Sequence, residues 1–355
     1  MTAPSVEALD WPGILERLVG GGDLDEDLAA RVMGAVMGGQ VDPARIAALL
    51  TALRAKGEAP AEIAGFVRAM TDAAAHVELP EPLASQVVDV VGTGGDRADT
   101  FNISTVAAVV VAAAGQPVAK HGNRAASSAC GSADLLEGWG IVLELSPEGV
   151  AACIEEVGIG FLYSRTFHPA MRVVGPIRQQ LGIRTVFNLL GPLSNPAGTP
   201  VMAVGVSDPR LAPVMAEALA RLGKRHVLLF RGEDGLDELT ITGPSQLWEV
   251  RDGQVSTSRL DPRDLGLPLA RAEELAGGDV AENVAIADAI LEGEPGPRRD
   301  IVVLNAAAGL YVADAVPDLA AGITRAEAAI DGGTALALKQ RWVARTQELA
   351  EHLHG

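Results

Sequence analysis

Apolar residues recur at three- and four-residue spacing through the first 78 residues, which is typical of helices that bury one face. The spacing predicts helices over 11–18, 26–37, 43–56 and 60–75. Asp25 and Asp42 stand where helix N-caps are expected, and glycines at 20–22 and 38–39 separate neighbouring helices. Because Pro80 and Pro82 then mark a break, the N-terminal part is expected to be all helical.

The pattern changes after residue 86 to short β-branched runs that alternate with helical segments. Strands are predicted over 87–91, 117–120, 201–206, 227–230 and 301–304, with helices over 104–114 and 128–139 and a final helical segment over 326–353. Alternating strands and helices indicate a central, mainly parallel sheet flanked by helices. The sequence therefore predicts an α/β fold, with a small all-helical domain joined to a large α/β domain.

Composition and charge narrow the class of protein. The chain of 355 residues has 46 acidic and 28 basic side chains, and the resulting net charge of −18 argues against a nucleic-acid partner. No apolar run reaches the roughly 18 residues of a membrane span, and the first residues lack a signal-peptide pattern. Cys130 and Cys153 form no CxxC pair. These features predict a cytoplasmic protein with reduced cysteines and no membrane partner.

A glycine-rich turn, Gly92-Thr93-Gly94-Gly95-Asp96, follows the first predicted strand. Its spacing matches neither a Rossmann fingerprint nor a P-loop. Glycines still let backbone amides approach an anion, and the helix that follows adds positive charge at its N-terminus. That helix opens with Asn102-Ile103-Ser104-Thr105, which offers caps and polar ligands. A tight turn with an ordinary N-cap explains the segment equally well.

A second polar loop, Lys120 to Ser128, follows the next predicted strand. It combines a lysine, an asparagine, an arginine and two serine hydroxyls, which are residue types that bind phosphate. Consecutive parallel strands bring their carboxyl ends together at the edge where α/β folds bind ligands. The two loops together favour a ligand with two phosphate groups over a merely solvated loop.

Two further segments carry candidate chemistry. The acidic stretch 233–238 suggests Mg²⁺ held by carboxylates and substrate oxygens, and an acidic surface hairpin is the alternative. Arg178 is suited to clamp a carboxylate with two hydrogen bonds. His168 is an isolated histidine before a proline, a pattern more typical of a structural role. The remaining histidines show no zinc-ligand spacing.

Six motifs in order resemble the anthranilate phosphoribosyltransferase family: DVVGTGGD, FNIST, KHGNRAASSACGSADLLEGWG, FHPAMR, FNLLGPLSNP and DGLDELT, which begin at residues 89, 101, 120, 167, 187 and 234. The resemblance implies a small helical domain, formed by 1–78 and an excursion at about 166–190, hinged to an α/β domain formed by 79–165 and 191–355. It also implies a homodimer through the helical domain. Tyr163-Ser164-Arg165 departs from the family's usual Phe-Ala-Pro.

The resemblance also implies which residues bind each ligand. The set implied for phosphoribosyl pyrophosphate (PRPP) is Gly92, Gly95, Asp96, Thr100, Asn102, Ile103, Ser104, Thr105, Lys120, His121, Gly122, Asn123, Arg124, Ala125, Ala126, Ser127, Ser128 and Ser132. Mg²⁺ would be held by Ser104, Asp237 and Glu238. Anthranilate would contact Gly92, Asn123, His168 and Arg178. No residue is assigned as a general acid or base.

The implied reaction is displacement of pyrophosphate from the ribose C1 by the anthranilate amine, which gives N-(5-phosphoribosyl)anthranilate for tryptophan biosynthesis. Catalysis would come from stabilising the departing pyrophosphate and from positioning the amine. Pyrimidine nucleoside phosphorylases have a similar fold, but the KHGNRAASS run and the Asp237–Glu238 pair favour PRPP and a metal. A non-catalytic, nucleic-acid-binding relative would show a basic surface and degraded loops, unlike this acidic chain.

Overall fold

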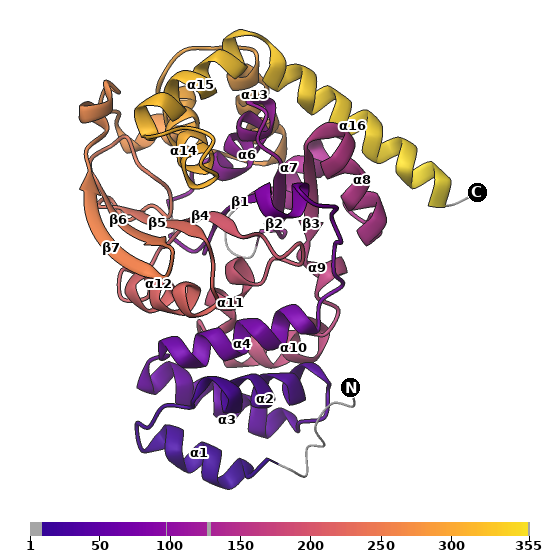
Figure 1. Cartoon of the computed structure of the whole chain (residues 1–355), viewed down its shortest axis with the longest axis vertical. Coiled ribbons are helices and arrows are strands. Elements are labelled where there is room, and N and C mark those ends of the chain that lie inside the picture. The colour runs from indigo at the N-terminus through magenta and orange to yellow at the C-terminus, as the bar shows by residue number, and fades with distance from the viewer. Residues whose placement is uncertain (1–8, 97, 126–128, 354–355) are drawn as a thin grey trace.

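The computed structural model describes residues 9–96, 98–125 and 129–353, and the bounds of its first four helices follow the apolar spacing. They are α1 (Trp11–Val19), α2 (Glu26–Met37), α3 (Pro43–Lys56) and α4 (Pro60–Asp72). The Asp25 carboxylate caps α2 by accepting a hydrogen bond of 2.8 Å from the Leu28 amide. The four helices form a bundle at the lower end of the molecule in Figure 1, with α4 nearest the larger part of the chain.

A seven-stranded sheet lies at the centre of the larger part, in the order β3-β2-β1-β4-β5-β6-β7. The strands are β1 (Val88–Gly92), β2 (Val118–Gly122), β3 (Ile159–Tyr163), β4 (Val201–Gly205), β5 (His226–Gly232), β6 (Ser245–Arg251) and β7 (Gln254–Leu260). The first five strands pair in parallel, and β6 and β7 are added antiparallel at one edge. The strand order reverses between β1 and β4, which is where parallel sheets bind ligands.

Helices cover both faces of this sheet because successive strand residues point to opposite sides. Ala203 packs into one core with α6 (Ile103–Ala113) and α14 (Pro297–Val312), whereas Val204 packs into a second core with α12 (Ala212–Arg221) and the bundle. The predicted fold class is thereby confirmed. The other α-helices are α5 (Leu83–Gln86), α7 (Ser132–Gly138), α8 (Pro147–Val157), α9 (Ser164–Phe167), α10 (Met171–Leu181), α11 (Phe187–Leu193), α13 (Val280–Leu291), α15 (Leu319–Asp331) and α16 (Thr334–Leu353).

Two local predictions were wrong. Residues 301–304 form part of α14 and not a strand; all four side chains are buried, so the run shows no helical periodicity. The helix predicted over 128–139 begins only at Ser132, after Gly131. The final segment is helical as predicted, and Gly332 and Gly333 divide it into α15 and α16. Strands β3, β6 and β7 were not predicted.

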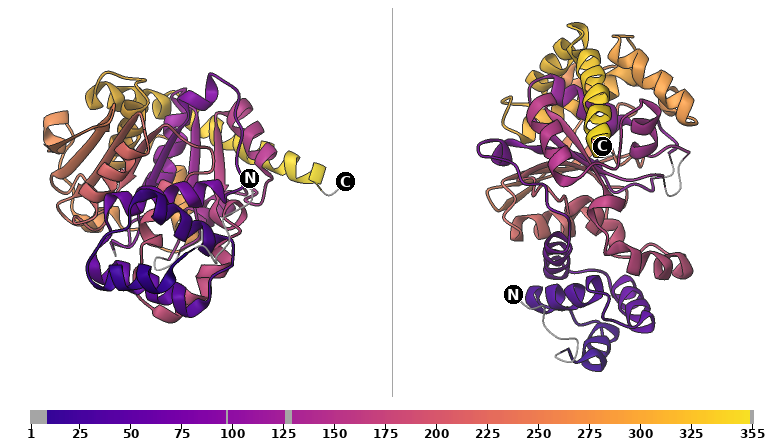
Figure 2. Two further views of the ribbon diagram at one scale, coloured as in Figure 1. Left: turned by 60° about the horizontal axis from the view of Figure 1, so that its bottom comes forward. Right: turned by 90° about the vertical axis from the view of Figure 1, so that its right-hand side faces the viewer.

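The segment from α9 to α11 returns to the helical bundle after β3. Helix α10 packs against α2 and α3, and α11 packs against α4. Figure 2 shows this segment running from the α/β part to the side of the N-terminal helices. This segment therefore brings its side chains close to the carboxyl ends of β1 and β2. Within the described ranges, no helix is long and apolar enough to cross a membrane.

Candidate active site

The glycine turn after β1 is held from two sides. Gly94 and Gly95 have φ angles of +66° and +79°, a region that glycine adopts without the strain of a side chain. The Asp237 carboxylate accepts a hydrogen bond of 2.6 Å from the Gly94 amide. Arg184 Nη1 donates to the carbonyl oxygens of Gly94 and Gly95 at 3.3 and 3.4 Å. The conformation of the turn is thus fixed by contacts within the protein.

Asp237 and Glu238 reach this turn from the segment after β5. Glu238 Oε1 accepts a hydrogen bond of 3.2 Å from the Ser104 amide at the start of α6. Burial raises the pKa of Asp237 to about 7, and the charge and hydrogen bonding of Asp96 add to the shift. Burial and the charge of Asp237 raise the pKa of Glu238 well above its usual range. The charge of Lys120 opposes the shift of Glu238 without cancelling it, so the cluster keeps an excess of negative charge when both carboxyls are ionised.

The donor set fits Mg²⁺ that is shared with substrate oxygens. Ser104, Asp237 and Glu238 lie together, as predicted from the sequence, and Asp96 lies beside Asp237. In the described part of the chain, no three His, Cys, Asp or Glu side chains are arranged to hold a metal by themselves. Mg²⁺ usually takes one or two protein carboxylates and completes its shell with water and phosphate oxygens. The cluster matches a site in which protein carboxylates supply part of the metal's shell and substrate oxygens supply the rest.

Lys120 is a buried cation between β1 and the start of α6. Its side chain is 2% exposed, and Nζ donates to the Val90 carbonyl at 2.7 Å and to Ser104 Oγ at 3.5 Å. Burial lowers the pKa of Lys120, while the charges of Asp89 and Glu238 oppose that shift. Lys120 therefore connects β2 with β1 and with the N-terminus of α6.

Asp89 and Asn195, which sequence reasoning missed, hold β1 and β2 together next to Lys120. The Asp89 carboxylate accepts hydrogen bonds from Asn195 Nδ2 at 2.8 Å and from the His121 amide at 3.2 Å. Burial raises the pKa of Asp89 to about 6. Asn195 also donates to the Ala119 carbonyl at 2.8 Å, so it links β1, β2 and the end of α11. Both residues lie within the six motifs, which was the one signal that could have found them.

The segment 100–105 contributes mainly backbone. Thr100 forms an isolated β-bridge with Ala276. The Asn102 side chain donates to the Cys130 carbonyl at 3.0 Å and accepts from Asn283 at 3.1 Å. Ile103 and Thr105 are buried in α6 and are each 1% exposed. The amides of Ile103, Ser104 and Thr105 already donate to Phe101, Glu238 and Asn102, so what this segment offers an anion is the positive end of the α6 dipole.

The second loop is described only in part, because Ala126, Ser127 and Ser128 lie outside the described residues. Arg124 pairs with Asp134 at 2.8 Å and with Glu137 at 2.9 Å. The Asp134 carboxylate also accepts from the Ala125 amide at 3.0 Å, and Ser132 Oγ donates to the Asn123 carbonyl at 3.1 Å. The described part of the loop is thereby tied to α7, with Arg124 already paired.

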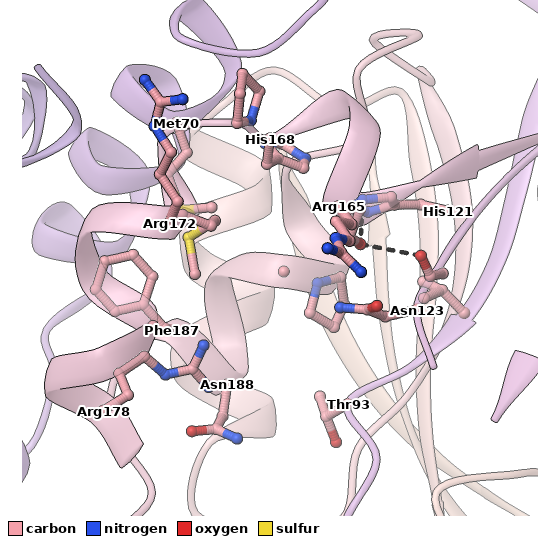
Figure 3. Close-up of a pocket in the computed structure, with 18 of the residues that line it drawn as sticks. Met70, Thr93, His121, Asn123, Arg165, His168, Arg172, Arg178, Phe187 and Asn188 are labelled. Carbon is pink, nitrogen blue, oxygen red and sulfur yellow. Dashed lines mark hydrogen bonds between the residues drawn. The ribbon is translucent and has the colours of Figure 1, made fainter. Parts of the chain in front are cut away.

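A cavity of about 790 Å³ opens beside the glycine turn, and the four residues predicted to contact anthranilate, Gly92, Asn123, His168 and Arg178, all line it. Its walls also include Met70 from α4 and Phe187 from α11. Figure 3 shows His121 and Asn123 on one side and Arg178 with Phe187 on the other. The Arg178 guanidinium lies 5.6 Å from the centre of the Phe187 ring. The cavity therefore lies between the sheet edge and the helices of the bundle side.

Two neutral histidines form part of the wall, with ring centres 5.1 Å apart. Burial lowers the pKa of His121 to about 3 and that of His168 to about 4. His121 Nε2 lies 2.9 Å from Ser164 Oγ. Within the described residues, His168 Nε2 has no hydrogen-bond partner, whereas the ring is bonded to the Ser194 backbone. His168 is thus suited to accept a hydrogen bond from a ligand. Gly122 ends β2 beside these rings.

Comparison with known proteins shows the family of this chain. The glycosyl transferase family a/b domain matches residues 84–336, and the glycosyl transferase family helical bundle domain matches residues 12–74. An anthranilate phosphoribosyltransferase of Chloroflexus aggregans (strain MD-66 / DSM 9485) is 53% identical over 324 residues, which are 91% of this chain and 94% of that protein. The chain belongs to the anthranilate phosphoribosyltransferase family.

Solved structures of anthranilate phosphoribosyltransferases have the same fold. The enzyme from Thermus thermophilus matches with a TM-score of 0.89 and 47% identity, over 96% of this chain and 100% of that one. The enzyme from Saccharomyces cerevisiae, in complex with PRPP and Mg, matches with a TM-score of 0.86 and 28% identity, over 95% and 98%. The resemblance carried by the six motifs is thus confirmed.

Proposed function

We propose that this chain transfers the phosphoribosyl group of PRPP to the amine of anthranilate, giving N-(5-phosphoribosyl)anthranilate and pyrophosphate in tryptophan biosynthesis. One observation carries the proposal. A cavity that presents Arg178 opens at the same glycine turn that Asp237 binds. A carboxylate-bearing acceptor and a phosphorylated donor would therefore meet at Gly92.

PRPP would lie across the two loops at the carboxyl ends of β1 and β2. The glycine turn and the positive N-terminal end of α6 would face its phosphates, since a helix N-terminus favours anions. Lys120 would supply positive charge from behind Ser104. Ser132, Asn123 and the loop to Ser128 would hold the remaining phosphate. Arg124 contributes less directly, because Asp134 and Glu137 already hold it.

Ser104, Asp237 and Glu238 would hold Mg²⁺ together with PRPP. When bound, the metal supplies positive charge that neutralises the departing pyrophosphate. The raised pKa values of both carboxyls support this assignment, because they indicate an acidic cluster that a cation would relieve. The yeast enzyme of the same fold was solved with PRPP and Mg.

Anthranilate would enter the cavity with its carboxylate toward Arg178, whose planar guanidinium can donate two parallel hydrogen bonds. His168 Nε2 and the Asn123 side chain would receive the amine and turn its lone pair toward the ribose C1. In the reaction the C1–oxygen bond breaks, the C1–nitrogen bond forms, and one amine proton passes to solvent. No general base is assigned, because an aromatic amine is neutral near pH 7.

A pyrimidine nucleoside phosphorylase activity is less well supported. A phosphorylase has no pyrophosphate for a carboxylate-held metal to neutralise, yet here the buried Asp237 and the half-buried Glu238 form a carboxylate pair at the glycine turn. We further propose that the helical domain comprises 1–78 with 166–190, that it mediates a homodimer, and that the protein is cytoplasmic. The packing of α10 on α2 and α3 supports that domain boundary. Sedimentation analysis would test the dimer.

The activity is tested by identifying the product. Purified protein with PRPP, Mg²⁺ and anthranilate should yield one pyrophosphate for each phosphoribosyl anthranilate detected by mass spectrometry. Replacing anthranilate with inorganic phosphate and a pyrimidine nucleoside should yield no free base. Nucleoside cleavage without anthranilate transfer would overturn the proposal in favour of a phosphorylase.

A further inference from the structure

The acceptor cavity carries more positive charge than one carboxylate requires. Arg165, Arg172 and Arg178 all line it, and none of the lining residues is acidic. This concentration stands out in a chain whose net charge is −18. Across the described residues, these three guanidinium groups have no carboxylate partner, whereas Arg124 is held by Asp134 and Glu137. The cavity is therefore built for anions.

Two of these arginines lie on opposite walls. Arg165 is exposed and lies beside His121 and Asn123, whereas Arg178 is partly buried across the cavity beside Phe187 (Figure 3). Arg172 extends away from both. Because a single carboxylate cannot engage guanidinium groups on both walls at once, an acceptor held by Arg178 leaves Arg165 available.

The backbone that carries Arg165 is fixed. Ser164, the preceding residue, has its hydroxyl 2.9 Å from His121 Nε2 and 3.0 Å from the Gly122 carbonyl oxygen. These contacts attach the start of α9 to the end of β2. Arg165 is thus presented at a constant position on the wall, although its side chain is exposed. A fixed backbone with an unpaired cation is what a ligand-binding position requires.

We infer that Arg165 forms a second anion-binding position in the acceptor cavity, so that the site selects aminobenzoates with a second acidic group besides the carboxylate held by Arg178. This inference rests on the proposed function. A volume of about 790 Å³ leaves room for the added group, since cavities of about 300–1,000 Å³ hold drug-sized ligands. The reaction is the same: the C1–oxygen bond breaks, the C1–nitrogen bond forms, and pyrophosphate leaves.

The test compares charged and neutral acceptors of nearly equal size. The acceptors are anthranilate, 2-aminobenzene-1,4-dicarboxylate, 4-aminobenzene-1,3-dicarboxylate, and the two analogues whose second carboxylate is a carboxamide. The rate of pyrophosphate release gives kcat/KM for each. At least one dicarboxylate should exceed its carboxamide by about three- to fivefold, the range expected for a solvent-accessible ion pair. Arg165→Gln should remove this preference, and Arg172→Gln should keep it.

The outcomes separate the inference from the proposed function. Anthranilate turnover by the wild-type protein tests the function alone. If anthranilate is used but neither dicarboxylate is preferred over its carboxamide, the inference is wrong and the function stands. If Arg165→Gln keeps the preference, or raises the KM for PRPP without changing the preference, Arg165 does not bind the acceptor. Equal losses in Arg165→Gln and Arg172→Gln would show general electrostatic attraction and overturn a specific position.

Discussion

Arg184 and Gly94 are 90 residues apart in the chain, yet Arg184 Nη1 and Nη2 both donate to the Gly94 carbonyl oxygen at 3.3 Å. Ser207 Oγ donates to the same oxygen at 2.9 Å. Arg184 follows α10, the helix that carries Arg178. The segment that lines the acceptor cavity therefore also holds the turn proposed to bind PRPP.

Removing this contact should weaken PRPP binding. Arg184→Ala frees the carbonyls of Gly94 and Gly95, so the amides of the turn lose their fixed direction. We expect the KM for PRPP to rise about tenfold, in line with the loss of charge-assisted hydrogen bonds, and the KM for anthranilate to change less. Steady-state kinetics with each substrate varied would measure both constants. Added guanidinium ion should restore part of the PRPP affinity.

Arg221, an exposed arginine of α12, provides the control for that experiment. Arg221→Ala should leave both Michaelis constants unchanged. An Arg184→Ala protein with normal kinetics for PRPP would show that Asp237 and Ser207 hold the turn without Arg184.

Arg178 should govern the affinity for anthranilate. Burial lowers the pKa of Arg178, but a guanidinium stays protonated in a protein. Arg178→Gln should raise the KM for anthranilate at least about tenfold, with a smaller change in the KM for PRPP. Arg178→Lys keeps the charge but not the planar pair of donors, so its KM should be intermediate. If all three proteins share one KM for anthranilate, Arg178 is not the clamp.

Asp237 should make PRPP binding depend on pH. Burial raises its pKa to about 7, so near neutral pH the carboxylic acid form is present before Mg²⁺ binds. Binding of Mg²⁺ with PRPP needs the carboxylate, so the proton must leave. The KM for PRPP should therefore fall as the pH rises from 6 to 8, and calorimetry in buffers of different ionisation enthalpy should show proton release.

The two histidines of the cavity do not contribute to the expected change in the KM for PRPP between pH 6 and 8. Burial places the pKa of His121 at about 3 and that of His168 at about 4, so neither titrates between pH 6 and 8. Asp237→Asn should weaken the pH dependence of PRPP binding, and Glu238, whose pKa burial also raises, should account for the part that remains. A KM for PRPP that stays constant from pH 6 to 8 in the wild-type protein would contradict the assignment.

Gly205, at the end of β4, lets the Asp237 backbone approach the sheet. A Cβ at this position would overlap the Asp237 carbonyl oxygen. Gly205→Ala should displace Asp237, lower the free energy of unfolding by about 1–3 kcal/mol and reduce activity more than stability. In contrast, Gly243→Ala adds a Cβ with no heavy atom within 4 Å and should be close to neutral. Thermal unfolding and kcat would be compared for both variants, and equal behaviour would refute the role of Gly205.

Local sequence patterns predicted the helical bundle well and the edges of the sheet poorly. The first four helices have amphipathic spacing and N-caps, so their bounds were read to within a few residues. The β6–β7 hairpin has a signal that was overlooked: Asp252 and Gly253 turn with φ angles of +50° and +76°, as a two-residue hairpin requires. The run 301–304 had no such signal, since a helix buried on all sides lacks periodicity.

The site followed from motifs more than from physical patterns. Glycines, acidic pairs and polar loops in the amino-acid sequence were enough to indicate phosphate and metal chemistry. The contact between Arg184 and Gly94, and the support of Asp89 by Asn195, depend on long-range packing that spacing does not encode. That Arg165 has no carboxylate partner among the described residues is likewise a property of the folded cavity.

The loss of anthranilate fluorescence on mixing the purified protein with PRPP tests the central claim most directly. The account predicts a decrease that requires protein, PRPP and Mg²⁺ together and that stops when the limiting substrate is consumed. Fluorescence that persists with all three components present, while anthranilate is shown to bind, would contradict the proposed transfer.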